Sequence, residues 1–236
     1  MKGKLIVIDG GDGSGKTVQS LLLRDYLKKN HLPVSYFDFP QYDGFYGQIV
    51  ARFLSGEFGG LDQVSPYLTA LVFALDRATV SKKISKHLKK GNYIVCNRYA
   101  TSNFVYQGAK ILHQQDRDKF NKWVFDLEYK IQKLPKEDIV IYLFVPWQIG
   151  SVLSKQKGKK KYLSDKSNDI HEDNGVYRKK VEKLYLENSK KNKHWLKINC
   201  VRNGNLLNKQ AIHAQIIAIL KQKKIISKYT DLTKSN

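Results

Sequence analysis

The amino-acid sequence predicts an α/β protein of three layers (α/β/α) with a five-stranded parallel sheet in the middle. Short apolar runs rich in β-branched residues alternate with segments whose apolar residues recur at helical spacing. One run, residues 139–144, is apolar almost throughout, as expected for a parallel strand covered on both faces. A glycine-rich loop, residues 10–17, joins the first run to the first helical segment. We therefore expect one domain over residues 1–236.

The first strand is expected at residues 5–8, and the helix after the loop is expected to end near Asn30. The second strand, residues 34–39, is closed by Pro40, because proline has no N–H to donate to a sheet. A short helix is expected at about residues 48–54, before a cluster of glycines breaks the chain.

A long helix is expected to begin at Ser65-Pro66, since serine is a good N-cap and proline fits the first helical turn. It is expected to run to Gly91 and to be followed by the third strand, residues 93–96. Residues 97–99 end this strand, and a turn at 100–108 places polar groups at its carboxyl end. Doubly wound sheets bind their ligands at such ends.

The second half of the chain continues the alternation of strands and helices. Residues 154–174 are polar and lysine-rich with scattered apolar residues, which predicts a mobile lid. The other expected elements are a helix at 116–133, a strand at 139–144, a short helix from Pro146, a helix at 174–191, a strand at 195–199 and a helix at 208–224.

The formal net charge of +21 raises the alternative of a nucleic-acid-binding protein. Aromatic residues do not interleave with the basic runs, so we expect no specific nucleic acid as a partner. Only seven of the 42 basic residues are arginines, which makes Arg52, Arg77 and Arg98 candidates for bidentate phosphate recognition. No run of about 18 apolar residues occurs, and residues 1–4 lead into the first strand without a small-residue cleavage site, so we expect neither a membrane span nor a signal peptide. We expect a cytoplasmic protein without a membrane partner.

The loop Gly10-Gly11-Asp12-Gly13-Ser14-Gly15-Lys16-Thr17 matches G-x-x-x-x-G-K-[ST], the phosphate-binding P-loop. Its glycines let backbone N–H groups turn onto an anion, and the helix that follows adds a positive partial charge. Lys16 is expected to reach the β- and γ-phosphates of ATP or GTP. Thr17 and Asp9 are expected to hold Mg²⁺.

Four further motifs follow the P-loop in order, namely Phe39-Pro40, Phe73-Ala74-Leu75-Asp76-Arg77, Asn97-Arg98-Tyr99 and Ser102 to Gly108. With the P-loop they resemble the thymidylate kinase family over nearly the whole chain. The resemblance implies a P-loop kinase fold with a mobile lid. It also implies transfer of the γ-phosphoryl group of ATP to dTMP, giving dTDP and ADP, with Mg²⁺ as cofactor. We also expect a homodimer.

By this resemblance Phe73 stacks on the thymine, and Arg77 and Gln107 hydrogen-bond to it. The matched motifs also place one set of residues at the dTMP site: Phe39, Pro40 and Ser102. Tyr162 in the lid resembles a tyrosine that packs near the sugar C2′ and excludes a ribose hydroxyl.

Arg98 is similar to the arginine that grips the acceptor phosphate and, with Lys16 and Mg²⁺, neutralises the transferring phosphoryl group. Arg52 is expected to help it. Asp12 matches an acidic position that accepts a hydrogen bond from the deoxyribose 3′-OH. The expected catalytic residues are Lys16, Arg98 and the lid residue Lys161.

The chain departs from the family's pattern at three positions. Gly13 stands where some members carry an arginine, so we expect Lys161 to supply the transition-state cation. Tyr42 stands where many relatives place a phosphate-binding arginine. Asn97 stands where the family usually has Asp or Glu. Since a phosphate monoester has a second pKa of about 6, the acceptor needs no general base, and we expect Asn97 to weaken only the hold on Mg²⁺.

Two alternatives stay open. The first is another deoxynucleoside monophosphate kinase or a deoxynucleoside kinase, which differs in whether the acceptor must carry a 5′-phosphate. The second is the nucleic-acid-binding P-loop ATPase. Arg98 and Arg52 favour a phosphorylated acceptor.

Overall fold

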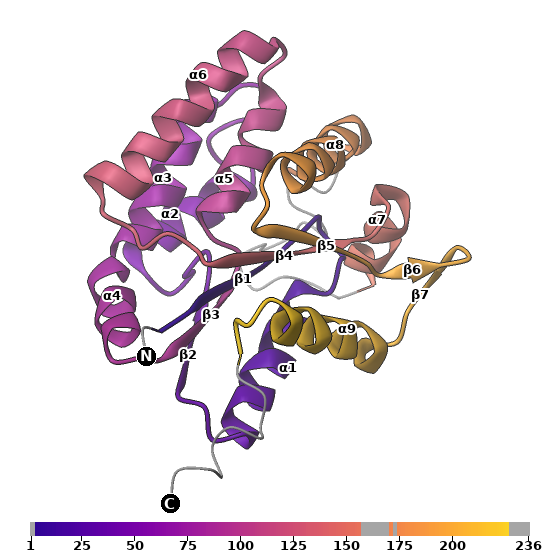
Figure 1. The fold of residues 1–236 in the computed structure, drawn as a ribbon. Helices are drawn as coiled ribbons and strands as arrows, with labels where there is room; N and C mark the ends of the chain where they lie inside the picture. The colour runs from indigo at the N-terminus through magenta and orange to yellow at the C-terminus, as the bar shows by residue number, and fades with distance from the viewer. Residues whose placement is uncertain (1–2, 157–169, 172–173, 227–236) are drawn as a thin grey trace, which may run out of the picture.

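A parallel sheet forms the centre of the molecule (Figure 1). The computed structural model describes residues 3–156, 170–171 and 174–226. The five strands lie in the order β2-β3-β1-β4-β5, and every neighbouring pair is parallel. Their bounds are β1 (Leu5–Asp9), β2 (Val34–Asp38), β3 (Tyr93–Asn97), β4 (Ile139–Phe144) and β5 (Trp195–Asn199). The predicted fold class and all five predicted strands are confirmed.

Helices cover both faces of the sheet (Figure 1). Helices α1 (Lys16–Lys29) and α9 (Lys209–Gln222) pack on one face, and α4 (Ser81–Lys89), α5 (Ala100–Tyr106) and α8 (Gly175–Lys191) pack on the other. Helix α3 (Pro66–Ala78) lies outside α5, between α2 (Phe45–Leu54) and α6 (Gln114–Phe125). Helix α7 (Trp147–Lys155) and a small hairpin, β6 (Val201–Arg202) and β7 (Asn205–Leu206), complete the α-helices and β-strands of the described residues.

Successive residues of each strand point to opposite faces, and the two halves of the core follow that alternation. Leu5 and Val7 of β1 pack toward α5 and α8, whereas Ile6 and Ile8 pack toward α1 and α9. All four side chains are fully buried, as expected for the central strand of a parallel sheet.

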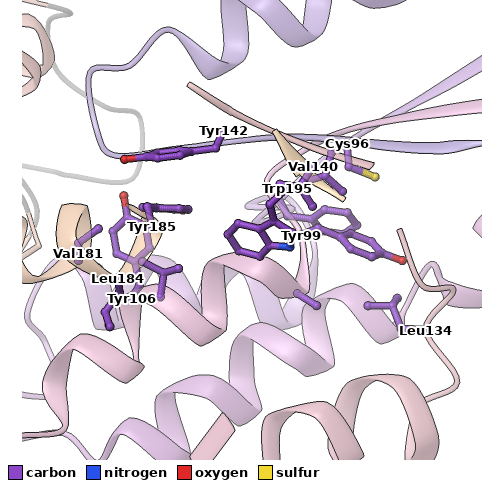
Figure 2. Close-up of a cluster of buried hydrophobic side chains, with 14 of the residues drawn as sticks. Cys96, Tyr99, Tyr106, Leu134, Val140, Tyr142, Val181, Leu184, Tyr185 and Trp195 are labelled. Carbon is purple, nitrogen blue, oxygen red and sulfur yellow. The ribbon is translucent and has the colours of Figure 1, made fainter. Parts of the chain in front are cut away.

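Aromatic rings fill the core between the sheet and α8 (Figure 2). The rings of Tyr142 on β4 and Tyr185 on α8 stack, with centroids 4.9 Å apart and planes 12° apart. Tyr106 at the end of α5 meets Tyr185 edge-on at 6.2 Å. These rings fix α5 and α8 beside the carboxyl ends of the central strands.

The single long helix expected from Ser65 to Gly91 is wrong, because the chain breaks between α3 and α4. Ser65 does cap α3, and its side chain accepts a hydrogen bond from the Tyr67 N–H at 3.3 Å. At the other end, the Asp76 carbonyl oxygen accepts hydrogen bonds from the Gln41 side chain and from the Thr79 hydroxyl group. Contact with the distant loop that carries Gln41 therefore accompanies the end of α3.

Two other predictions differ from the structure. The helix expected at 116–133 is α6 followed by a π-helical turn, Asp126–Ile131. The turn expected at 100–108 is instead α5, followed by a 3₁₀ turn at Gly108–Lys110. Most of the predicted lid, including Lys161 and Tyr162, lies outside the described residues. Among the residues that are described, no helix is both long and apolar enough to cross a bilayer.

Candidate active site

The P-loop joins β1 to α1 at the carboxyl end of the sheet. Lys16 folds back over the loop, where its Nζ donates to the Gly11 carbonyl oxygen at 2.7 Å and lies 3.9 Å from the Asp12 carboxylate. The Lys16 side chain is only 8% exposed. The ammonium group is therefore held at the mouth of the loop, where the helix N-terminus also attracts anions.

Gly13 lies against α7 and has a left-handed backbone with φ of 83°. A Cβ atom at this position would lie 2.1 Å from the Gly150 carbonyl oxygen, which is backbone and belongs to α7. No side chain fits there without moving that helix. This close approach gives a physical reason for the absence of an arginine inside the loop.

Arg98 follows β3 directly and faces the P-loop, as the sequence predicts. Its own backbone is left-handed, with φ of 63°. Its Nη2 donates to the Asp12 carboxylate, and its guanidinium lies 4.8 Å from the centre of the Tyr106 ring. The Tyr106 hydroxyl donates to the other Asp12 oxygen at 2.9 Å. Asp12, Arg98 and Tyr106 thus form one network over the loop.

Asp9, the last residue of β1, is fully buried and points toward α5 and α8. Its carboxylate accepts hydrogen bonds from the Thr101 hydroxyl at 2.6 Å, the Ser102 hydroxyl at 2.9 Å and the Tyr185 hydroxyl at 2.6 Å. Burial raises the pKa of Tyr185 well above its usual value and the Asp9 charge raises it further, so this phenol keeps its proton and donates. A metal role for Asp9 and a substrate role for Ser102 stay predictions.

On the opposite face, Asn97 links Thr17 of α1 to Asp38 of β2. Its Nδ2 donates to Asp38 Oδ1 at 2.8 Å and to Thr17 Oγ1 at 3.1 Å. Its Oδ1 is buried and, within the described part of the chain, has no hydrogen-bond partner. Asp38 is exposed, yet the surrounding protein displaces enough water to raise its pKa, an effect that the hydrogen bond from Asn97 opposes.

These oxygen donors fit a hard divalent cation. Mg²⁺ prefers oxygen ligands and usually takes one or two carboxylates together with phosphate oxygens and waters. A hydroxyl group at Thr17 and a carboxylate at Asp38 meet that preference. The described residues hold no cluster of three His, Cys, Asp or Glu that would bind a metal by protein ligands alone.

Of the residues predicted to read the base, Phe73 and Arg77 belong to α3, and Gln107 directly follows α5. Arg77 is 1% exposed and donates from Nε and Nη2 to the two Glu128 oxygens, at 2.7 Å and 2.6 Å. Gln107 is also 1% exposed, and its Oε1 has no partner among the described residues. Phe73 is half-buried beside the cluster of Phe53. Their contacts to a thymine stay predictions. Because Nε and Nη2 of Arg77 donate to Glu128, Nη1 is the guanidinium nitrogen of Arg77 that does not donate to Glu128.

Two other predicted site residues lie in different surroundings. Arg52 is exposed, and its Nε donates to the Glu57 carboxylate at 2.8 Å and 2.9 Å. Its contacts do not join the network of Arg98. Phe39 is 2% exposed and packs against Tyr99 in the core, next to the half-buried Pro40. The substrate roles of Arg52, Phe39 and Pro40 stay predictions.

The described end of the lid region lies beside the network of Arg98. The Ile170 N–H donates to the Leu54 carbonyl oxygen of α2 at 3.1 Å. The His171 ring lies 5.4 Å from the Tyr106 ring and 5.2 Å from the Tyr177 ring of α8. This short segment therefore connects α2 to α8 across the site.

Arg178 and Glu128 contact residues of the candidate site, and they were not singled out in the sequence analysis. Arg178 of α8 is 6% exposed and donates from Nη2 to the Asp12 carbonyl oxygen at 2.9 Å. As one of only seven arginines in a lysine-rich chain, it carried the same signal as Arg98. Glu128 also had a signal, because a carboxylate four residues after the apolar Val124 lies on a face expected to be buried and needs a partner there.

The fold and the site together define a kinase of the P-loop class: a phosphate-binding loop, an arginine facing it and oxygen donors for a cation at the carboxyl ends of parallel strands. A family model described as thymidylate kinase matches residues 8–216. The chain belongs to the thymidylate kinase family, as its sequence motifs predict, and this family uses ATP.

Individual relatives agree with this assignment. The chain is 36% identical to the thymidylate kinase of Plasmodium falciparum over 146 residues, which are 61% of this chain and 63% of that protein. It is 30% identical to a probable thymidylate kinase of Methanococcus aeolicus over 229 residues, which are 94% of this chain and 98% of that protein. The solved structure of thymidylate kinase from Candida albicans has a similar fold, with a TM-score of 0.74, 21% identity and 96% of each chain covered.

Proposed function

We propose that this protein transfers the γ-phosphoryl group of ATP to dTMP and releases dTDP and ADP, using Mg²⁺, as a step toward dTTP. The observation that carries the proposal is the position of Arg98, whose guanidinium faces the P-loop from the end of β3. A cation there can meet an acceptor phosphate beside the loop that holds Lys16. Phosphoryl transfer depends on such positioning and on neutralising the charge of the transferring group.

Each group acts in a defined way. Lys16, held at the loop mouth, contacts the β- and γ-phosphates. Mg²⁺ held near Thr17 would supply further positive charge to the phosphate groups. When dTMP binds, Arg98 gives up part of its hydrogen bonding to Asp12 and donates to the acceptor phosphate instead. The Asp12 carboxylate then accepts a hydrogen bond from the 3′-OH of the sugar. The acceptor is already largely dianionic at neutral pH, so Asn97 is not required as a base.

Selectivity for dTMP is tested by measuring ADP release from ATP with dTMP, dCMP, dGMP, AMP and thymidine. We expect dTMP to be the best acceptor, because Phe73, Arg77 and Gln107 would read the base and Arg98 the phosphate. Gln107→Ala should raise the dTMP requirement more than the ATP requirement. Equal or better activity on another acceptor would overturn the proposal, and activity on thymidine would favour a nucleoside kinase.

The lid makes a second test. With no room for an arginine at Gly13, the transition-state cation must come from another part of the chain, and Lys161 precedes Tyr162 in the lid. Lys161→Ala should lower kcat by roughly 10²-fold while ATP binding changes little. Lys161→Arg should keep or raise the rate, because arginine offers a planar fork in place of a point charge.

We also propose that two copies of the chain form a homodimer, the arrangement expected from its sequence. Sedimentation equilibrium of the full chain measures this directly. A single species at the mass of one chain, 27.2 kDa, would exclude it.

A further inference from the structure

Three carboxylates lie around the P-loop: Asp9 at the end of β1, Asp12 inside the loop and Asp38 at the end of β2. They differ in the partners that their oxygens already have. Asp12 accepts from Arg98 and from the Tyr106 hydroxyl group, one on each oxygen. Its carboxylate is committed to the network that faces the acceptor phosphate.

Asp9 is committed to the other face of the sheet. Along β1 the odd-numbered side chains point toward α5 and α8, and Asp9 follows Leu5 and Val7 in that alternation. Three hydroxyl groups donate to its two oxygens, and the residue is fully buried. The Thr17 hydroxyl group lies on the opposite side, beside the residues that face α1.

Asp38 lies on the same side as Thr17. It pairs directly with Asn97 in the parallel register of β2 and β3, so both side chains point to the α1 face. The Asn97 Nδ2 atom lies 2.8 Å from Asp38 Oδ1 and 3.1 Å from Thr17 Oγ1 and donates to both. Asp38 is exposed, whereas Asp9 is buried, so a hydrated cation can reach its carboxylate.

The orientation of the Asn97 amide follows from this pair. An ionised carboxylate only accepts hydrogen bonds, so the amide must turn its NH₂ group toward Asp38. A second carboxylate at position 97 would face Asp38 at hydrogen-bond distance, and two like charges at that separation repel. The amide at 97 and the carboxylate at 38 therefore fit each other.

We propose that Asp38 is the carboxylate that holds the Mg²⁺ shell beside Thr17, in place of Asp9 and of an acidic residue at position 97. Asp38 binds the cation or one of its waters, and Asn97 positions both Asp38 and Thr17 through its NH₂ group. This inference rests on the proposed function, because Mg²⁺ is the partner of ATP in that reaction. From the sequence alone, we expect Asn97 to weaken the hold on Mg²⁺. Under this proposal the hold is kept, because Asp38 on the neighbouring strand β2 supplies the carboxylate that position 97 lacks.

The test measures Mn²⁺ binding in the presence of ADP. Electron paramagnetic resonance reports this binding as a loss of the signal of free Mn²⁺. It uses the full chain without dTMP, so it reports on the metal site even if dTMP is not the acceptor. We expect Asp38→Asn to weaken Mn²⁺ binding about tenfold or more. Asp38→Glu, which keeps the charge, should recover much of the affinity.

Asp118→Asn is the matched control, because it removes one exposed carboxylate from α6, far from the loop. It should leave Mn²⁺ affinity within about twofold of the parent. Thermal unfolding without metal shows that each variant is folded, and Asp38→Glu provides a second reading if Asp38→Asn is not. Parent-like Mn²⁺ affinity in Asp38→Asn, or equal losses in Asp38→Asn and Asp118→Asn, would overturn the proposal.

Discussion

The Arg178 guanidinium donates a 2.9 Å hydrogen bond to the backbone carbonyl oxygen of Asp12, 166 residues earlier in the chain. Its other terminal nitrogen donates to the Ser154 hydroxyl at 3.2 Å. One buried side chain of α8 therefore connects the P-loop with α7. The loop backbone is therefore contacted from outside the loop, at the Asp12 carbonyl group.

Arg178→Met should weaken ATP binding and lower the free energy of unfolding by about 1–3 kcal/mol, because it leaves the Asp12 carbonyl group without its donor. Arg202→Met, which changes an exposed arginine of β6, serves as the control and should alter neither. Titration calorimetry with ATP and urea unfolding measure the two effects. An Arg178→Met protein that matches the control in both would show that the contact does not support the loop.

The buried pair of Arg77 and Glu128 should show strong coupling. Arg77→Met leaves a charged Glu128 buried without its cation, so we expect a loss of about 3–5 kcal/mol in the free energy of unfolding. Glu128→Gln, which keeps an acceptor for the Asn103 amide, should also destabilise. The double variant should lose less free energy of unfolding than the sum of the two single variants, by at least about 1 kcal/mol. Additive losses in urea unfolding would show that the pair is not coupled.

Gly13→Ala should be more harmful than an alanine at another left-handed glycine. Gly204 has φ of 78°, and a Cβ atom there would meet no other atom within 4 Å, so Gly204→Ala measures backbone strain alone, about 1–2 kcal/mol. Gly13→Ala adds the clash with Gly150, for which we expect at least about 1 kcal/mol more and weaker ATP binding. Equal losses in thermal unfolding would mean that α7 moves aside freely.

Lys110 should make stability depend on pH in the alkaline range. Burial lowers its pKa from 10.5 to about 8, although its Nζ donates to the Val64 carbonyl oxygen at 3.2 Å. Between about pH 8 and 10.5 the unfolded chain therefore binds more protons at this lysine than the folded chain does, so stability rises with pH there.

Relative to Lys110→Met, the parent should gain about 1 kcal/mol in its free energy of unfolding between pH 7 and pH 10, a figure reduced for partial solvent screening. Lys119→Met, at a lysine whose side chain is 75% exposed, shows the general effect of removing a charge at each pH. Urea unfolding at the two pH values gives the comparison. A parent that gains nothing over Lys110→Met would contradict the lowered pKa.

The five strands were predictable because each is a short segment in which apolar residues predominate, and such a segment needs no distant partner to be recognised. The break after α3 was not, since the Asp76 carbonyl group meets Gln41 from a loop 35 residues away. Helix α5 has seven residues, which is too short to show helical periodicity, and it begins three residues after a strand. Local patterns therefore locate the sheet better than the helices packed around it.

At the site, the sequence placed Lys16, Thr17 and Arg98 around one loop, and the structure brings them there. It did not single out Asp38. That residue is noteworthy only because β2 and β3 pair in a register that sets it opposite Asn97, and nothing local in the sequence states which strands are neighbours. Arg178 belongs to a helix far along the chain and reaches the loop only through the packing of α8.

The π-helical turn at Asp126–Ile131 has a consequence for comparing this chain with its relatives. Such a turn holds one residue more than an α-helical turn, so it rotates every later side chain about the helix axis by roughly a quarter turn. Glu128 lies inside this turn and accepts hydrogen bonds from Arg77 there. A relative with a regular helix here would present a different position to the arginine, and an alignment needs a one-residue gap to match the two carboxylates. Insertion or deletion of a single residue at this turn would therefore change which side chain faces Arg77.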